Sequence, residues 1–276
     1  MKFNLLLIGT LVLLFSFEHK PLTWVAIGDS ITYLNDHLKE TDNKVTKGYM
    51  TLVKEQLPHI NYINQGHNGW TAVRIAESID KLGLLKADVY SIFLGTNDWW
   101  RGLPLGQLSD YKNNTGTGTV HGAFRVIVNK LRSLNPDAKI ILITPMQRVD
   151  FIHYSNMKNH AWGSYKEKNG QWLEQFANAV DSIGQFEHLA VVDLYHTKKL
   201  SHKHLIHFKR LKDPATGLYR DYKWPDFKDI PFNPETDNYP YPKESIDMTY
   251  DGLHPSDAGY RVIAKKLKKV LKTAER

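Results

Sequence analysis

Short apolar runs that are rich in Val and Ile recur along the chain and predict β-strands. The five runs are "TWVAIG" (23–28), "INYIN" (60–64), "VYSIFLG" (89–95), "KIILIT" (139–144) and "LAVVDL" (189–194). Their apolar content is typical of strands that are buried on both faces of a sheet.

The stretches between these runs show helical periodicity. It is clearest in 120–134 and 260–271, where apolar residues recur every three or four positions. Strands that alternate with helices favour a parallel sheet with helices on both faces. With 276 residues, of which 42% are hydrophobic, the chain predicts one α/β domain over residues 21–276.

Three segments are longer than simple connections require: 99–119, 146–170 and 195–250. The last is the longest and is rich in Tyr, Trp and Phe among Pro, Asp and Lys. We expect a folded insertion at about 195–250, packed on the main domain, with most of its aromatic side chains in a small core.

The first 20 residues resemble a leader. Met1 and Lys2 precede an apolar run, Leu5 to Phe17, which is typical of a secretory signal and short for a membrane span of ~20 residues. The exit "SFEHKPLTW" has no clear small-x-small cleavage site. We therefore expect a periplasmic or secreted protein, soluble or held by its uncleaved N-terminal segment, with no stable membrane span.

Charge and cysteine content exclude other classes. The net charge is +7, but the basic residues are scattered except in the last helix, and no nucleic-acid module is present. We expect no nucleic-acid partner. The absence of cysteine from the sequence excludes disulfides and thiolate metal sites.

Ligands of open parallel sheets bind beyond the carboxyl ends of the strands. The segments that follow the five runs are "GDS" (28–30), "NQGHNGWT" (64–71), "GTND" (95–98), "TPMQR" (144–148) and, beyond the insertion, "DGLHPS" (251–256). All but the fourth deliver a residue type that acyl transfer uses.

Ser30 is the candidate nucleophile, although a serine at a helix start is more often a cap. Acyl transfer also needs a base and an acid that orients it. His254 is the candidate base, and Asp251 lies three residues earlier, within reach of the other imidazole nitrogen in a tight turn. "DGLHPS" also reads as a turn that opens the final helix, and both interpretations can hold together.

The oxyanion needs donors. The backbone N–H groups of Ser30 and Gly69 and the side-chain amide of Asn97 are the candidates. Taken singly, Gly69 is better explained by a positive φ angle and Asn97 by a turn.

The four blocks at Ser30, Gly69, Asn97 and Asp251–His254 resemble, in order, those of the SGNH hydrolase superfamily, also called GDSL-type esterases. The resemblance implies a flavodoxin-like three-layer α/β/α fold with long loop insertions and ester hydrolysis through a serine acyl-enzyme, with no metal or other cofactor. Ile31 follows the serine where Leu is common. The long segment before Asp251 departs further from the family, so the pocket shape does not carry over.

The segments beside the expected site are aromatic and charged, which favours a polar ligand. Candidate substrate contacts are Trp70, Trp99, Trp100, Arg101 and Arg148, where the tryptophans stack on sugar rings and Arg148 pairs with an anionic sugar. Taken singly, each tryptophan is better explained by packing under the insertions, and Arg148 is equally explained by a salt bridge.

The sequence thus predicts an esterase that removes acetyl or another small acyl group from a carbohydrate or other small-molecule ester. A lysophospholipase or thioesterase is the second interpretation. A non-catalytic glycan-binding protein is the third, although binding alone needs no oriented base.

Overall fold

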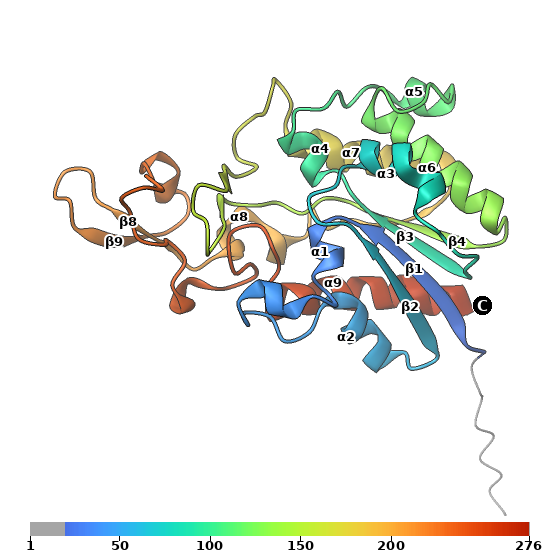
Figure 1. The fold of residues 1–276 in the computed structure, drawn as a ribbon, viewed down its shortest axis with the longest axis horizontal. Helices are drawn as coiled ribbons and strands as arrows, with labels where there is room; N and C mark the ends of the chain where they lie inside the picture. Colours follow the sequence, from blue (N-terminus) through green and yellow to red (C-terminus); the bar gives the residue numbers. More distant parts are fainter. Residues whose placement is uncertain (1–19, 276) are drawn as a thin grey trace, which may run out of the picture.

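The computed structural model describes residues 20–275, so the predicted leader falls almost entirely outside the described residues. Its centre is a five-stranded parallel sheet in the order β2-β1-β3-β4-β7. The strands are β1 (Leu22–Gly28), β2 (Ile60–Gly66), β3 (Val89–Phe93), β4 (Lys139–Ile143) and β7 (Ala190–Val192). Helices cover both faces of the sheet (Figure 1). The predicted three-layer α/β/α fold is confirmed.

Two hydrophobic cores cover the two faces, because successive strand side chains point to opposite sides. Trp24 and Ala26 of β1 belong to one core, and Val25 and Ile27 belong to the other. The first core includes α2 (Tyr49–Gln56) and α9 (Asp257–Leu271), and the second includes α3 (Ala72–Ser78), α6 (Val120–Leu134) and α7 (Leu173–Glu187).

The edge strands differ from the prediction of burial on both faces. In β2 only Ile60 is buried, and in β7 only Val192 is buried. Both strands lie at the edges of the sheet, where one side of each strand has no neighbouring strand. The prediction was wrong for these two strands because a local apolar run does not reveal its place in the strand order.

The carboxyl ends of the inner strands are level. Gly28 at the end of β1 pairs with Gly66 of β2 and with Phe93 of β3. The loops that follow these strands therefore emerge side by side at one edge of the sheet, as the parallel topology requires.

Short elements complete the chain. They are the helices α1 (Ser30–Tyr33), α4 (Thr96–Trp100), α5 (Leu108–Lys112) and α8 (His202–Leu205), the strands β5 (Phe151–Ile152), β6 (His160–Ala161), β8 (Lys209–Lys212) and β9 (Tyr219–Tyr222), and the 3-10 helices η1 (Leu38–Thr41), η2 (Ile79–Lys81), η3 (Lys198–Leu200), η4 (Asp226–Asp229), η5 (Lys243–Ser245) and η6 (Lys272–Glu275).

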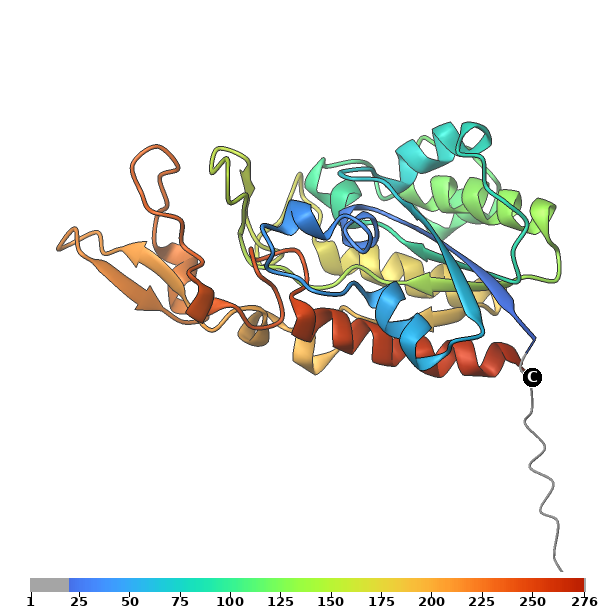
Figure 2. The same ribbon diagram turned by 60° about the horizontal axis from the view of Figure 1, so that its bottom comes forward.

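The long segment 195–250 contains the antiparallel β8–β9 hairpin, which protrudes beyond the carboxyl end of the sheet in both views (Figures 1 and 2). Its two ends are joined by a short neck, defined by hydrogen bonds from Thr249 N to Leu205 O (2.8 Å) and from Met248 N to His204 O (3.3 Å). The neck returns the chain to the sheet at Tyr250. None of the helices within residues 20–275 has the length and apolarity that crossing a bilayer requires.

Candidate active site

Ser30 is the first residue of α1, directly after the end of β1. Asp29 is the N-cap residue, because its carboxylate accepts a 3.0 Å hydrogen bond from the backbone N–H of Ile31. The turn is tight, because a Cβ on Gly28 would lie 2.1 Å from Oγ1 of Thr32 in α1. Only glycine therefore fits at this position. Ser30 therefore has no capping role, and its hydroxyl is free to meet His254.

Three side chains form a hydrogen-bonded chain. Ser30 Oγ lies 2.9 Å from Nε2 of His254, and Nδ1 of His254 lies 2.7 Å from Oδ2 of Asp251. The other carboxylate oxygen accepts from the backbone N–H groups of Leu253 (3.0 Å) and His254 (2.8 Å). Because the acceptor carboxylate faces Nδ1, the proton lies on Nδ1, which leaves Nε2 to accept from the serine hydroxyl.

The turn that carries this histidine has a fixed shape. Gly252 adopts a φ of +88°, and a Cβ there would lie 2.0 Å from the carbonyl oxygen of Asp150. Ser256 then caps α9 by accepting from the backbone N–H groups of residues 258 and 259. His254 thus lies two residues before Ser256, the N-cap of α9. The turn that opens the final helix therefore also fixes the position of the candidate base.

The three candidate oxyanion donors come from three separate strand ends. Ser30 N–H lies in the first turn of α1 and has no partner within the helix. Gly69 adopts a φ of +73°, and its carbonyl accepts a 2.9 Å bond from Nη2 of Arg101. Asn97 Nδ2 donates to Trp70 O (2.9 Å), which fixes the amide plane and leaves its second N–H for an acceptor. Such donors can stabilise an oxyanion.

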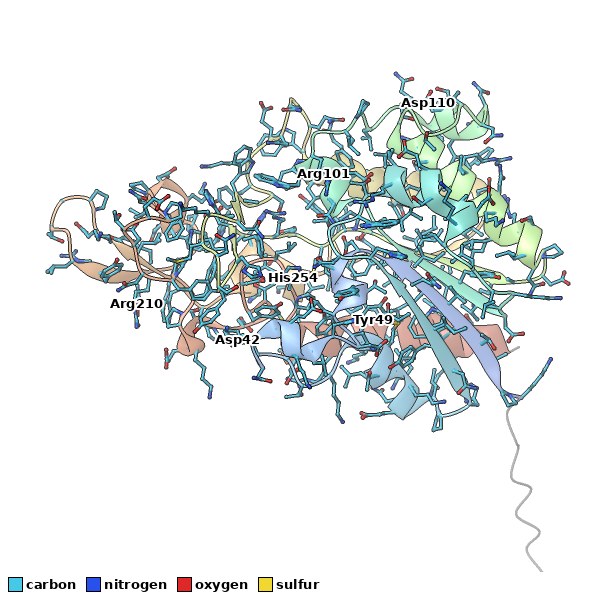
Figure 3. The ribbon with its side chains drawn as sticks, viewed as in Figure 1. Asp42, Tyr49, Arg101, Asp110, Arg210 and His254 are labelled. Atoms are coloured by element: carbon cyan, nitrogen blue, oxygen red, sulfur yellow. The ribbon has the colours of Figure 1, made fainter. Side chains whose placement is uncertain are left out.

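A cavity of about 500 Å³ lies over these groups and is lined by Ser30, Asp251, His254, Gly69 and Asn97, among others. In Figure 3, His254 lies between the sheet and the protruding hairpin that carries Arg210. The inner wall is a small apolar cluster of Phe151, Ala161 and Leu253, packed against Trp100. The Phe151 ring meets the imidazole of His254 edge-on, with centroids 5.5 Å apart.

The outer wall of the cavity is polar. One side is formed by residues 39–44 and the other by residues within 153–159. The Nζ atom of Lys44 lies 3.8 Å from the ring centroid of Tyr154 and joins the two sides. Neither side was predicted from the sequence to contact a ligand. The charged run "KETDNK" (39–44), soon after α1, is the signal that could have identified the first.

The sequence matches a protein-family model over most of its length. The model of the GDSL-like lipase/acylhydrolase family matches residues 26–262. The chain belongs to this family. The predicted membership of the SGNH/GDSL superfamily is therefore confirmed, and the protein is a GDSL-type carboxylic ester hydrolase.

Solved structures agree with this GDSL assignment. A possible lipase from Chitinophaga pinensis DSM 2588 is 60% identical, with a TM-score of 0.90, over 91% of this chain and 98% of that one. A protein from Lactobacillus plantarum has the same fold at 21% identity, with a TM-score of 0.58, over 93% of this chain and 99% of that one. None of the curated proteins compared matches the sequence.

Two buried carboxylates lie behind the GDSL serine. Burial raises the pKa of Asp29 to about 6, against the lowering effect of its Ile31 hydrogen bond and of the His254 charge. Burial likewise raises the pKa of Asp98 to about 6. Asp98 accepts from the backbone N–H of Ala72 (2.9 Å) and so holds the start of α3.

Arg148 is a fully buried cation that lines the GDSL cavity. Its Nη2 donates to Trp162 O (3.0 Å), while its Nε has no hydrogen-bond partner in the structure. Burial lowers the pKa of Arg148 to about 10, which the charges of Asp150 and Asp251 oppose. Among the described residues Arg148 forms no ion pair, so the salt bridge that was its alternative explanation is not formed. The guanidinium retains hydrogen-bonding capacity, so a ligand anion could use it.

The other predicted substrate contacts separate into two groups. Trp100 lines the cavity. Trp99 is a correction, because it is 0% exposed, lies in the second core and donates from Nε1 to Gln171 O. Trp70 stacks on His67 with centroids 4.4 Å apart, and Arg101 holds the Gly69 carbonyl. Neither of these two lines the cavity.

The GDSL site contains side chains suited to acyl transfer. Within residues 20–275, no group of three or more His, Cys, Asp or Glu side chains is arranged to hold a metal ion.

Proposed function

We propose that the protein is a serine esterase that removes acetyl or another small acyl group from a carbohydrate through an acyl-enzyme intermediate. The observation that carries the proposal is the hydrogen-bonded chain from Asp251 through His254 to Ser30 beneath the cavity. A glycan-binding protein would have no use for such an oriented base.

In the first half-reaction, Ser30 Oγ attacks the ester carbonyl carbon while its proton passes to Nε2 of His254. The tetrahedral oxyanion accepts hydrogen bonds from Ser30 N–H, Gly69 N–H and Asn97 Nδ2–H. Asp251 stabilises the imidazolium that forms. The bond to the alcohol oxygen then breaks, that oxygen takes the proton from Nε2, and the acyl group remains on Ser30.

In the second half-reaction, water attacks the acyl carbon and gives its proton to Nε2 of His254. The bond from carbon to Ser30 Oγ breaks, and Oγ regains the proton. The free carboxylic acid leaves the site, and the enzyme returns to its starting state.

The apolar cluster beside His254 supports a small acyl group. Phe151, Ala161 and Leu253 form a small cluster of buried side chains, and Trp100 is the one partly buried hydrophobic residue, among those described, that packs against it. A long acyl chain would continue past this cluster onto the charged outer wall, and burying carbon chains against charged groups is unfavourable.

The outer wall and Arg148 support a sugar as the alcohol portion. Trp100 offers an aromatic face for stacking on a sugar ring. The buried Arg148 guanidinium, with its unpartnered Nε, fits a carboxylate or sulfate of that sugar. An Arg148→Ala variant that keeps the wild-type preference for acidic over neutral acetylated glycans would contradict this role.

A lipid hydrolase is the second candidate, and the observation in its favour is the 60% identity to a possible lipase. The two candidates differ in the acyl chain they accept. Lipid hydrolysis requires apolar surface for eight or more carbons.

The test compares p-nitrophenyl acetate, p-nitrophenyl octanoate and a panel of acetylated polysaccharides, with wild type and Ser30→Ala side by side. The proposal expects activity on acetate and glycan that is lost in Ser30→Ala. A preference for octanoate would favour the lipid hydrolase, and activity that survives in Ser30→Ala would refute the role of Ser30.

We also propose that the protein is exported, on the basis of the leader-like sequence before residue 20. Fractionation of the native host, followed by N-terminal mass spectrometry, tests this. Recovery of the protein only from the cytoplasm would contradict it.

A further inference from the structure

A second cavity, of about 370 Å³, adjoins the catalytic one. The β5–β6 hairpin separates the two cavities, and Ala161 lines both. Side chains of a strand alternate in direction, and accordingly Phe151 lines the catalytic cavity whereas its neighbours Asp150 and Ile152 line the second. The opposite wall is formed by residues 228–232 of the insertion.

The second cavity is positively charged. Lys209 is 1% exposed and pairs with Asp150 at 2.7 Å, so these two charges compensate each other. Lys166 and Lys228 come from opposite walls, and neither forms an ion pair with a carboxylate of the described residues. Besides Asp150, which pairs with Lys209, Asp229 is the one acidic lining residue among those described.

The Asp150 carboxylate is also fully engaged in hydrogen bonds. Its Oδ1 accepts from the backbone N–H of Gly163 (2.8 Å) and from the hydroxyl of Tyr165, while Oδ2 accepts from Lys209. The basic partner and these donors lower the pKa of Asp150, although burial opposes them. Asp150 therefore serves as a fixed anchor between the insertion and the β5–β6 hairpin, and an entering anion meets mainly Lys166 and Lys228.

An aromatic ridge connects the two cavities. Trp162 lines the second cavity and is 37% exposed. It contacts Trp100 of the catalytic cavity, with ring centroids 4.7 Å apart. The Nζ atom of Lys168 lies 4.5 Å from the Trp100 ring and 4.6 Å from the Trp162 ring. A partly exposed indole flanked by cations is suited to a sugar ring that carries an anionic group.

We propose that the second cavity is a subsite for a sugar residue next to the acylated one, and that this residue carries a carboxylate or sulfate. The inference rests on the proposed function, because the path of the polymer is defined by an acylated residue that lies at Ser30. The substrate is then an acylated anionic oligosaccharide or polysaccharide that crosses the Trp100–Trp162 ridge. Lys166 and Lys228 are the positioning residues of this subsite.

Binding is measured on full-length Ser30→Ala protein by calorimetry, with oligogalacturonate, sulfated dextran oligomers and neutral dextran oligomers as probes. The first two distinguish carboxylate from sulfate. The proposal expects at least one anionic probe to bind more tightly than the neutral one. Lys166→Gln/Lys228→Gln should reduce this preference about 10-fold, because two charge-assisted contacts are lost.

The matched control is Lys86→Gln/Lys265→Gln, which removes two exposed lysines outside both cavities and should keep the wild-type preference. Equal binding of charged and neutral probes, or an equal loss in both double variants, would overturn the subsite. Because binding requires no turnover, this measurement is separate from the esterase assay, and a failure of the subsite is distinguishable from a failure of the proposed function.

Discussion

The Nε2 atom of His254 lies 2.9 Å from the Oγ atom of Ser30, across 224 residues of sequence. A second contact joins the same two elements, since the buried hydroxyl of Tyr260 in α9 donates to Ile31 O in α1 at 3.0 Å. The distance between the candidate nucleophile and the candidate base is therefore set by two helix starts that are bonded to each other, rather than by a flexible loop.

Ser30 and His254 should act as one unit. We expect Ser30→Ala and His254→Ala each to lower kcat on p-nitrophenyl acetate by about a million-fold, and the double variant to lose no more than either alone. Thermal unfolding curves of the variants serve as the folding control. Losses that multiply in the double variant would mean that the two residues act independently.

Asn97 should contribute only in the transition state. Asn97→Ala removes one oxyanion donor, so kcat should fall about 100 to 1000-fold with little change in KM. Arg101→Ala, which removes the bond to the Gly69 carbonyl, should lower kcat less, because the Gly69 N–H itself remains. Steady-state kinetics on one ester check both, and a pure KM effect for Asn97→Ala would contradict the oxyanion role.

Asp29 should give the rate a dependence on pH near 6. Its pKa is raised to about 6 by burial, so its negative charge is present above that pH and is lost below it. The charge stabilises the imidazolium of His254 in the transition state. Asp29→Asn keeps an N-cap residue but should lower kcat at pH 8 about 10-fold and remove this contribution from the pH profile.

The same carboxylate should affect folding with the opposite sign. The folded pKa of Asp29 lies above the unfolded value of 3.8, so the folded state binds the proton more tightly. The free energy of unfolding should rise as the pH falls from about 6 towards 3.8, and Asp29→Asn should show a smaller rise. Denaturant titrations at several pH values measure this, and identical slopes in both proteins would contradict it.

Phe151 should limit acyl length. Its ring closes the apolar cluster beside His254, and Phe151→Ala would open space there. The ratio of kcat/KM for p-nitrophenyl octanoate to that for acetate should increase about 10-fold, because added CH₂ groups gain apolar contact. Leu85→Ala, an exposed leucine outside the cavity, is the control, and an unchanged ratio in Phe151→Ala would place the acyl group elsewhere.

The candidate site residues whose proximity the sequence predicted are those tied to a strand end or to one turn. Ser30, Gly69 and Asn97 follow three strands directly, and the parallel register brings these ends level. Asp251 and His254 belong to one short turn. In each case the position of the residue was predicted from two features. One is a short local sequence pattern, and the other is the parallel topology that the alternation of strands and helices predicts.

The predictions for the tryptophans required information that the sequence lacks. Trp99 and Trp100 are adjacent, yet Trp99 is fully buried and Trp100 lines the cavity. Each step along a helix rotates the side chain by about 100°, and a five-residue helix shows no periodicity from which its inward face can be read. The contact between Lys44 and Tyr154 joins two loops distant in sequence, which local patterns do not predict.

The neck beneath the protruding hairpin has a consequence for how this enzyme can diversify. Its hydrogen bonds at Leu205 and Thr249 close the excursion before the chain reaches Asp251, and lengthening a closed loop costs little free energy. Variation in length can therefore be confined to the tip of the hairpin between β8 and β9 (213–218) without moving Asp251, whereas Lys209 and Tyr241 must stay because both bond to Asp150.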